Sequence, residues 1–248
     1  MPRGGALVLY ARVPRAGRVK TRMLPWLDAG EALRLHLVLF EDSLRLLKTC
    51  AGTAGAEPFL SMSEPWDPEG VDGCAGIADA AGGIARLPQS GTDLGERLRE
   101  TFRTLLARGF GRVVVIGSDS PTLPRTHLTT ALEALERGAD AVLGPARDGG
   151  YCLVGATREL PGMFETIPWG TARVLQATRA ALERCGARVV MLPPWYDVDL
   201  PRDLERLRRD LSTGPSRGRA PRGTSAFVEA LVRDGRLPLP RAQSPGRL

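Results

Sequence analysis

The chain has 248 residues, 43% of them hydrophobic and 25% charged, which is enough for one sizeable α/β domain with a buried core. Aromatic residues make up only 5%, which argues against a base-stacking RNA platform. The net charge of +6 comes mostly from residues 212–248, where seven Arg face two acidic residues. We predict one folded domain over residues 1–211 and a solvated or loosely docked basic tail over 212–248, with nucleic-acid binding disfavoured.

Cysteine and histidine usage excludes several other classes of protein. The four cysteines are far apart and no two form a C-x-x-C pair, which is typical of reduced thiols in the cytosol. Two histidines, His36 and His127, leave little for a zinc site or a Ser-His-Asp triad. No signal-peptide pattern follows Met1, and no apolar run approaches the ~20 residues of a membrane span. We therefore expect a cytoplasmic protein.

Apolar and amphipathic runs alternate along the chain, which is typical of an α/β fold with a mostly parallel sheet. The expected strands are, in chain order, 5–11, 58–62, 83–88, 112–117, 139–145, 151–155 and 187–192. The expected helices are 29–48, 93–108, 126–137, 171–185 and 201–211, with a short tail helix at 224–233. Asp28 and Thr171 are predicted N-caps, Asp93 with Glu96 a variant capping box, and Pro201 the first helical residue. The composition predicts a linker at 214–223 and a disordered end at 237–248.

Ligands of an open parallel sheet bind beyond the carboxyl ends of its strands, so the loops after strands are the places to search. The loop after the first strand carries five cations within eleven residues: Arg12, Arg15, Arg18, Lys20 and Arg22. Grouped cations repel one another unless an anion neutralises them, and phosphate does this well. The loop therefore favours phosphate binding, with a solvated basic loop as the alternative.

Carboxylates follow two other expected strands. Asp119, next to Ser118, comes directly after strand 112–117, and Asp197 and Asp199 come after the last strand. Mg²⁺ and Mn²⁺ prefer hard oxygen ligands and typically take one or two carboxylates plus substrate phosphates. Asp119 with Asp199 or Asp197 therefore predicts a divalent metal site, the alternative being that these residues cap a turn or a helix.

Two glycine-containing stretches complete the pattern. Gln89, Gly91 and Thr92 precede a helix N-terminus, where a base or a phosphate could approach, although a capped helix start explains most of this stretch. A second stretch, Asp148-Gly149-Gly150-Tyr151, lies between two expected strands, and Asp148 is a candidate base or acceptor ligand there. The alternative for this stretch is a tight hairpin turn.

Six motifs together resemble one bacterial family, the DUF2064 family of GT-A-like proteins, which is usually labelled glycosyltransferase. The resemblance covers about residues 7–211 in consistent order. The family looks related in turn to the molybdenum-cofactor and phospholactate guanylyltransferases. The motifs read ARVPRAGRVKTRMLP, QSGTDLGERL, GSDSPTLP, GPARDGGYCLVG, PWGTARVL and DVDLPRDL.

The resemblance implies a GT-A, nucleotide-diphospho-sugar transferase fold and a role for each matched residue. Asp119 matches the metal-binding acid at the central strand and Asp199 the second metal acid. Leu200 stands where relatives often have Thr. Lys20 and Arg22 match the phosphate-binding loop, and Gln89, Gly91 and Thr92 match the base-contacting stretch. Beside these matches, we expect Arg12, Arg18 and Ser118 to bind phosphate as well. The expected acceptor contacts are Asp148, Gly149, Gly150, Tyr151 and Trp169.

Three functions remain open at this point. In a metal-dependent glycosyltransferase, Mg²⁺ or Mn²⁺ on Asp119 and Asp199 stabilises a departing nucleoside diphosphate, with Asp148 as candidate base. In a nucleotidylyltransferase, an acceptor phosphate attacks an NTP while Lys20 and Arg22 stabilise its triphosphate. In a non-catalytic regulator, the nucleotide binds without turnover. The glycosyltransferase leads by a small margin, and the sequence does not indicate the base, the sugar, the acceptor or the oligomeric state.

Overall fold

The computed structural model describes residues 3–24, 26–69, 73–213 and 221–237. These residues form one seven-stranded sheet in the order β3-β2-β1-β4-β6-β5-β7. Every neighbouring pair is parallel except those of β6, which runs antiparallel to β4 and β5. The predicted α/β fold with a mostly parallel sheet is confirmed. The strands are β1 (Arg3–Ala11), β2 (Ala56–Met62), β3 (Ala85–Arg86), β4 (Phe110–Gly117), β5 (Ala141–Pro145), β6 (Tyr151–Ala156) and β7 (Val189–Met191).

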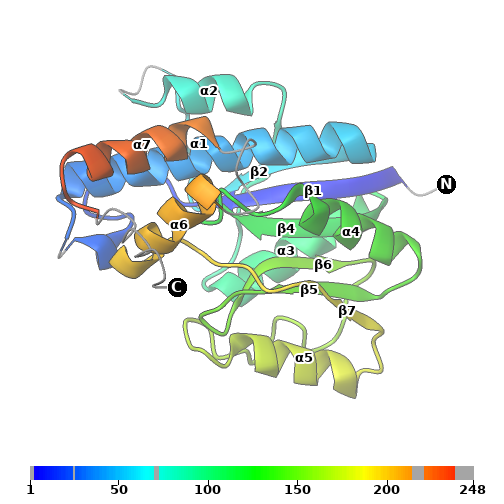
Figure 1. Cartoon of the computed structure of the whole chain (residues 1–248). Helices are drawn as coiled ribbons and strands as arrows, with labels where there is room; N and C mark the ends of the chain where they lie inside the picture. Colours follow the sequence, from blue (N-terminus) through cyan, green and yellow to red (C-terminus); the bar gives the residue numbers. More distant parts are fainter. Residues whose placement is uncertain (1–2, 25, 70–72, 214–220, 238–248) are drawn as a thin grey trace, which may run out of the picture.

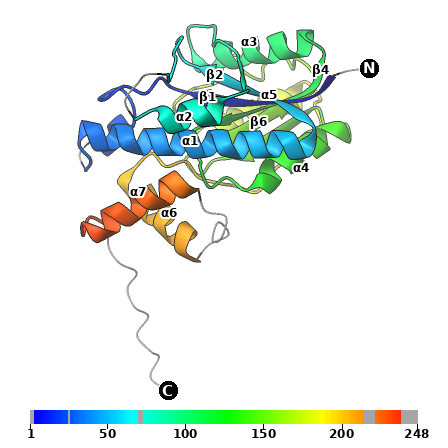
Figure 2. The same cartoon turned by 90° about the horizontal axis from the view of Figure 1, so that it is seen from above.

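Helices cover both faces of this sheet (Figures 1 and 2). Side chains alternate across a strand, so β1 sends Leu7 and Leu9 into one apolar core and Ala6 and Val8 into the other. The first core also receives α1, α2 and α4, and the second receives α3 and α5. The helices are α1 (Ala29–Ala54), α2 (Ala75–Ala81), α3 (Leu94–Ala107), α4 (Arg125–Glu136), α5 (Val174–Arg184), α6 (Pro201–Thr213) and α7 (Arg222–Arg233), with a short 3₁₀ helix η1 (Thr21–Met23).

The strand register brings several strand ends to one edge of the sheet. Tyr10 pairs with Gly117 across β1 and β4, and Ala11 pairs with Met62 across β1 and β2. The loops that follow β1, β2 and β4 therefore start side by side. This edge, which we call the carboxyl edge, is where the sequence places the candidate residues.

Local sequence explains the start of α1 as predicted, but not that of α3. The Asp28 carboxylate accepts from the Glu31 N–H at 2.8 Å, and the Glu31 carboxylate accepts from the Asp28 N–H at 2.9 Å, a complete capping box. Asp93 likewise accepts from the Glu96 N–H. The predicted capping box at α3 is nevertheless wrong, because Glu96 accepts from the N–H and the hydroxyl of Thr92 instead.

Two further local predictions are corrected. Thr171 is not the N-cap of α5; the helix begins after Arg173, and the Thr171 hydroxyl oxygen accepts from the Arg173 N–H one turn earlier. The strand expected at 83–88 shortens to Ala85–Arg86, and residues 87–90, which follow it, have no regular secondary structure.

The predicted tail helix is present as α7 and packs beside α1 and α6 (Figure 2). The N–H and the hydroxyl of Thr224 both donate to the buried Asp42 carboxylate of α1 at 2.7 Å. Val228 and Leu231 join a third apolar cluster, which also includes residues of η1, α1 and α6. The division at 211/212 stays a prediction, and residues 214–220 of the expected linker and 238–248 of the expected disordered end lie outside the described residues.

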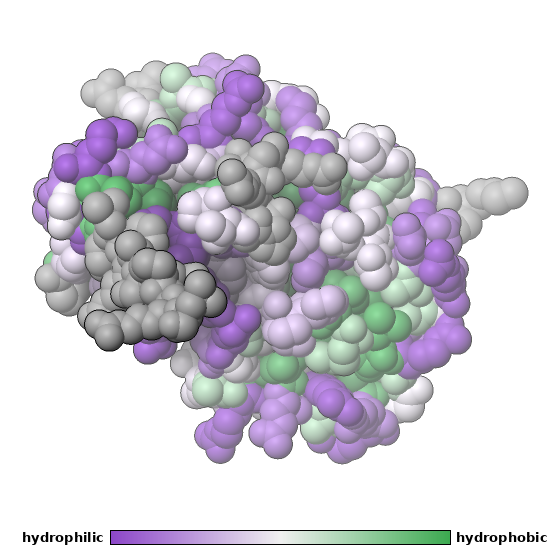
Figure 3. Space-filling model, viewed as in Figure 1, coloured by the Kyte–Doolittle hydropathy of each residue, from purple (hydrophilic) through white to green (hydrophobic). Residues whose placement is uncertain are grey.

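The surface carries two features of note. Among the described helices, none joins the length and the apolar character that crossing a membrane requires. On the face seen in Figure 3, apolar side chains gather beside α4, over the β5 and β7 side of the sheet. Met191 of β7 is 39% exposed.

Candidate functional site

Three side chains far apart in the sequence meet at the carboxyl edge. The Lys20 ammonium forms an ion pair with Asp119 Oδ1 at 2.6 Å, and it donates to Asp199 Oδ1 at 3.1 Å and to the Val198 carbonyl at 2.8 Å. We call Lys20, Asp119 and Asp199 the carboxylate–lysine cluster. The sequence predicted each of them as a site residue, and the structure brings them into direct contact.

The backbone around Lys20 turns its side chain inward. Lys20 adopts left-handed φ and ψ of 49° and 35°, which costs a non-glycine residue about 1 kcal/mol. Its carbonyl accepts from the Met23 N–H at 2.8 Å, which begins η1, and Met23 is fully buried in the third apolar cluster. Packing of η1 therefore holds the strained residue in place.

The two carboxylates of the cluster are tied together by the backbone. The Val198 N–H donates to the Asp119 carbonyl at 2.9 Å, which docks the segment after β7 against the end of β4. Asp203, in the first turn of α6, accepts from the N–H groups of Asp199 and Leu200 at 3.1 and 2.7 Å. Asp203 thus anchors the start of α6, and the Asp199 carboxylate points to Lys20.

The charges of the cluster stabilise one another. Burial alone would lower the pKa of the Lys20 ammonium, but the neighbouring Asp119 and Asp199 carboxylates outweigh burial and raise that pKa above its ordinary value. Burial would likewise raise the pKa of Asp119, but Lys20 and then His36 lower it below its ordinary value. Lys20 is therefore charged and Asp119 ionised near neutral pH.

Asp197 lies next to the cluster, but its pKa is raised, whereas that of Asp119 is lowered. Its carboxylate accepts a short hydrogen bond from the Ser120 hydroxyl. Burial raises the pKa of Asp197 to about 7, and the negative charges of Asp119, Asp199 and Asp148 act in the same direction. Of the two acids after β7, Asp199 contacts Lys20 and Asp197 does not, and the role of Asp197 as a metal ligand stays a prediction.

Asp119 and Asp199 fit a divalent cation that keeps water or substrate phosphate among its ligands. Their side chains are 39% and 38% exposed, although both contact an ammonium that is only 3% exposed. Mg²⁺ is commonly held by one or two carboxylates in this way. Within the described residues, no group of three or more His, Cys, Asp or Glu side chains is arranged to hold a metal ion, so a complete protein cage is not formed there.

The remaining cations of the basic loop face solvent. Arg12, Arg18 and Arg22 are exposed, and Arg15 forms an ion pair with Glu64 at 2.9 Å. The loop thus separates into one buried ammonium and a set of outward guanidinium groups. Phosphate binding by these arginines stays a prediction.

The stretch before α3 is anchored to the protein at the same edge. The Gln89 side-chain amide donates to the Ser61 carbonyl at 2.9 Å, next to the end of β2. Thr92 donates to Glu96, and the Arg97 guanidinium donates to the Gly91 carbonyl at 3.1 Å. These contacts order the helix start, and the base-binding role of Gln89, Gly91 and Thr92 stays a prediction.

The stretch 148–151 joins the antiparallel strands β5 and β6, so the alternative of a hairpin turn is the one the structure adopts. The Asp148 carboxylate accepts from the Gly150 N–H at 2.9 Å, and Gly149 has φ of 92°. Tyr151 meets Trp169 edge to face, with ring centroids 6.2 Å apart. We call Asp148, Gly149, Gly150, Tyr151 and Trp169 the hairpin region.

Sequence reasoning missed three residues, His36, Ser43 and Ser120, that hydrogen-bond to the segments carrying the site residues. His36 of α1 donates to the Arg12 carbonyl at 3.1 Å, and Ser43, seven residues later, donates to the Ser118 carbonyl at 3.2 Å. Ser120 donates to Asp197 and to the Tyr196 carbonyl. The signal for the first two was available: both are polar positions on the otherwise apolar inner face of α1.

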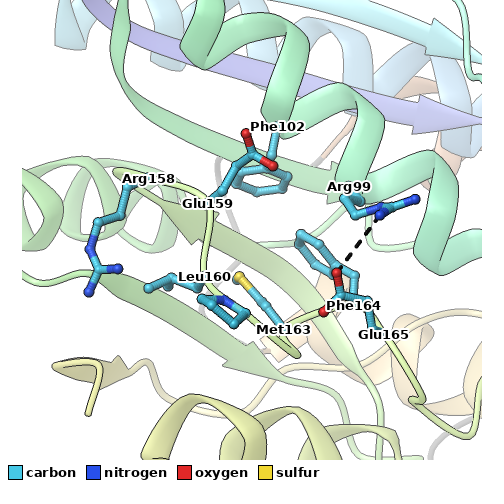
Figure 4. A pocket seen from close by; sticks show the side chains of 9 residues that line it. Arg99, Phe102, Arg158, Glu159, Leu160, Met163, Phe164 and Glu165 are labelled. Carbon is cyan, nitrogen blue, oxygen red and sulfur yellow. Dashed lines mark ion pairs between the residues drawn. The ribbon is translucent and has the colours of Figure 1, made fainter. Parts of the chain in front are cut away.

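A cavity of about 240 Å³ lies against α3, and none of the predicted site residues lines it (Figure 4). Its walls are mainly apolar, with Phe102, Met163 and Phe164 among them. Arg99 and Glu165 at its border approach to 3.9 Å. The cavity carries none of the charges of the cluster.

Comparison with known proteins places the chain in a family. The DUF2064 family, described as "Uncharacterized protein conserved in bacteria", matches residues 46–171. A crystal structure of a candidate nucleotide-diphospho-sugar transferase from Desulfovibrio desulfuricans G20 is 31% identical with a TM-score of 0.78, covering 93% of this chain and 97% of that one. Among proteins of curated function, none matches by sequence. The chain belongs to the DUF2064 family.

More distant solved structures share the fold alone. Glucosyl-3-phosphoglycerate synthase from Mycobacterium tuberculosis, in complex with Mn²⁺, UDP and glucosyl-3-phosphoglycerate, is 16% identical with a TM-score of 0.50, covering 96% of this chain and 82% of that one. These comparisons confirm the predicted nucleotide-diphospho-sugar transferase fold, and the 31% identical structure supports the prediction of a transferase.

Proposed function

We propose that the protein is a metal-dependent glycosyltransferase that uses a nucleotide-diphospho-sugar. One observation carries the proposal. The carboxylate–lysine cluster stands at the carboxyl edge, directly beside a loop of exposed arginines. Carboxylates recruit a divalent cation and guanidinium groups bind phosphate oxygens, so the two together match a metal-bound diphosphate.

Asp119 and Asp199 are the residues proposed to hold the Mg²⁺ or Mn²⁺. When bound, the cation supplies Lewis-acid stabilisation of the charge that develops on a departing nucleoside diphosphate. The exposed guanidinium groups of Arg12, Arg18 and Arg22 bind and orient the same phosphates. A protein of this fold, glucosyl-3-phosphoglycerate synthase, binds both Mn²⁺ and UDP, so the fold is compatible with the proposed ligands.

The hairpin region is proposed to receive the acceptor. Trp169 and Tyr151 offer an aromatic corner, and the Asp148 carboxylate is exposed beside them. An exposed carboxylate near the reacting centre can accept a proton from an attacking hydroxyl. Asp148 also lies close enough to raise the pKa of Asp197, which supports a shared site.

A nucleotidylyltransferase is the second candidate, and the density of the basic loop favours it. Three cations of the loop, Arg12, Arg18 and Arg22, are exposed, and a triphosphate would use more of them than a diphosphate. In that reaction an acceptor phosphate attacks the α-phosphorus and pyrophosphate leaves.

Product analysis distinguishes the candidates. A thermal-shift screen of NTPs and nucleotide-sugars, with and without Mg²⁺ or Mn²⁺, first finds the ligand, because ligands of the native state raise Tm by mass action. Anion-exchange chromatography then identifies the product. Release of a nucleoside diphosphate supports glycosyl transfer, and release of pyrophosphate establishes the second candidate instead. Binding without turnover, unaffected by Asp119→Asn, would instead identify a regulator.

A further inference from the structure

Lys20 was predicted to bind phosphate, but its ammonium is already surrounded by oxygen atoms of the protein. It donates to Asp199 Oδ1 and to the Val198 carbonyl, and it forms an ion pair with Asp119 Oδ1 at 2.6 Å. The side chain is 3% exposed, and Asp119 Oδ1, which it contacts, is itself buried. A phosphate could reach this ammonium only after one of the three contacts breaks.

The position of Lys20 affects the charge that a metal ion would meet. Asp119 and Asp199 contribute two negative charges, and Lys20 within 3.1 Å of both cancels one of them. A divalent cation at the exposed side of these carboxylates is attracted by two charges and repelled by a third of its own sign. The phosphates of a nucleotide add negative charge on the solvent side and offset that repulsion.

We infer that Lys20 is a positioning residue that makes metal binding at Asp119 and Asp199 depend on a bound polyphosphate. The inference rests on the proposed function, because it takes these two carboxylates as the metal ligands. From its buried position, Lys20 holds both carboxylates in place. Its positive charge also weakens their attraction for a metal ion that arrives without a polyphosphate. The exposed arginines Arg12, Arg18 and Arg22, which contact neither carboxylate in the described structure, bring the polyphosphate.

Titration with Mn²⁺ alone tests this inference without measuring activity. The electron paramagnetic resonance signal of free Mn²⁺ reports how much of the ion is bound. The wild-type protein is expected to bind Mn²⁺ weakly, and Lys20→Met at least ~10-fold more tightly, because removal of the ammonium leaves both negative charges uncompensated. Lys20→Arg keeps the charge and should remain weak. Arg15→Gln removes the same charge from the same loop, at a residue that pairs with Glu64, and its Mn²⁺ affinity should equal that of the wild type.

The wild-type protein provides a second measurement that does not depend on any variant folding. Pyrophosphate serves as a probe without a base, and Tm is measured with Mn²⁺, with pyrophosphate and with both. The inference requires that the shift with both exceed the sum of the two single shifts. For Lys20→Met, circular dichroism first establishes folding, and Mn²⁺ alone should then raise Tm.

The outcomes separate the inference from the proposed function. If wild type and Lys20→Met bind Mn²⁺ alone equally well, or if the variant binds it less well, the inference is overturned and the metal site stands. Additive shifts of the wild-type Tm overturn it as well. If neither protein responds to Mn²⁺ under any condition, and Asp119→Asn behaves like the wild type, both the inference and the proposed metal site are overturned.

Discussion

The carboxylate–lysine cluster and the hairpin region border the same edge of the sheet, yet different forces hold them. The cluster joins segments about 180 residues apart through ion pairs, with Lys20 contacting Asp199 and Val198. The hairpin region is held by local backbone bonds and by shape, since Gly149 passes so close to Ala172 that no side chain fits between them. Ion pairs thus hold the proposed metal-binding side of the site, and close packing holds the side that we propose receives the acceptor.

Removal of one charge from the cluster should have the largest effect. Asp119→Asn keeps the shape and a hydrogen-bond acceptor for Lys20 but removes the negative charge. We expect turnover of the nucleotide-sugar donor to fall by about 10²-fold or more, a typical cost of losing electrostatic stabilisation at a reacting centre. The rate of nucleoside diphosphate release at saturating donor measures it. Asp67→Asn, an exposed acid after β2, is the control, and a loss below tenfold for Asp119→Asn would contradict the charge-based role.

In the hairpin region, the addition of one methyl group should be enough to destabilise the fold. A Cβ on Gly149 would lie 2.2 Å from the Ala172 carbonyl oxygen, and φ is 92° there. We expect Gly149→Ala to lower the free energy of unfolding by about 2–3 kcal/mol, from backbone strain and overpacking together. Gly170→Ala is the matched control, because φ is 76° but nothing lies within 4 Å of its Cβ, so it should cost ~1 kcal/mol.

Urea denaturation gives both values. Equal losses for the two variants would show that φ alone, and not the approach to Ala172, shapes this region.

How far the sequence predicted these two regions depends on the range of the interactions. The strand ends could be placed because continuous apolar runs such as β4 mark buried parallel strands, and parallel strands end at one edge. Asp119 and Asp199 followed from that rule. The complete capping box of Asp28 and Glu31 could also be predicted, because its partners are three residues apart.

Other features depend on contacts between distant segments, which a pattern along one chain does not contain. The burial of Lys20 requires a left-handed backbone and a fully buried Met23, and neither is visible in a run of basic residues. The amphipathic pattern of α7 predicted a helix, but its attachment to Asp42 of α1 depends on a residue 182 positions from Thr224. The pair Gly149 and Gly150 was compatible with a ligand-contacting stretch or with a hairpin turn, so it did not by itself predict the antiparallel direction of β6.

Asp197 offers a way to sharpen the comparison, because charges from both regions act on it. Burial and the nearby Asp119, Asp199 and Asp148 raise its pKa to about 7. The folded protein therefore keeps a proton that the unfolded chain releases between about pH 4 and pH 7, and the contribution of Asp197 to the free energy of unfolding falls as pH rises through that range. Above pH 7 the loss is complete.

Between pH 5 and pH 8, the wild type should lose on the order of 2 kcal/mol more of its free energy of unfolding than Asp197→Asn, which has no carboxyl to ionise. Urea denaturation at the two pH values measures the difference. Glu229→Gln, an exposed acid of α7, should follow the wild type. If Asp197→Asn loses as much free energy of unfolding as the wild type between these pH values, the charges of the two regions do not raise the pKa of Asp197.

The smallest effect concerns the support behind the cluster. α7 packs on the apolar cluster that holds Met23 and therefore η1 and Lys20, whereas the hairpin region has no residue in that cluster. Thr224→Val removes the hydroxyl that donates to Asp42 but keeps the backbone donor, so the free energy of unfolding should fall by about 1 kcal/mol. Ser225→Ala is the neighbouring control: the Ser225 hydroxyl is buried without a hydrogen-bond partner among the described residues, so its removal should cost nothing or stabilise slightly. A Thr224→Val loss no larger than that of Ser225→Ala would mean that apolar packing alone holds α7, and that the tail supports the cluster without the buried Asp42 contact.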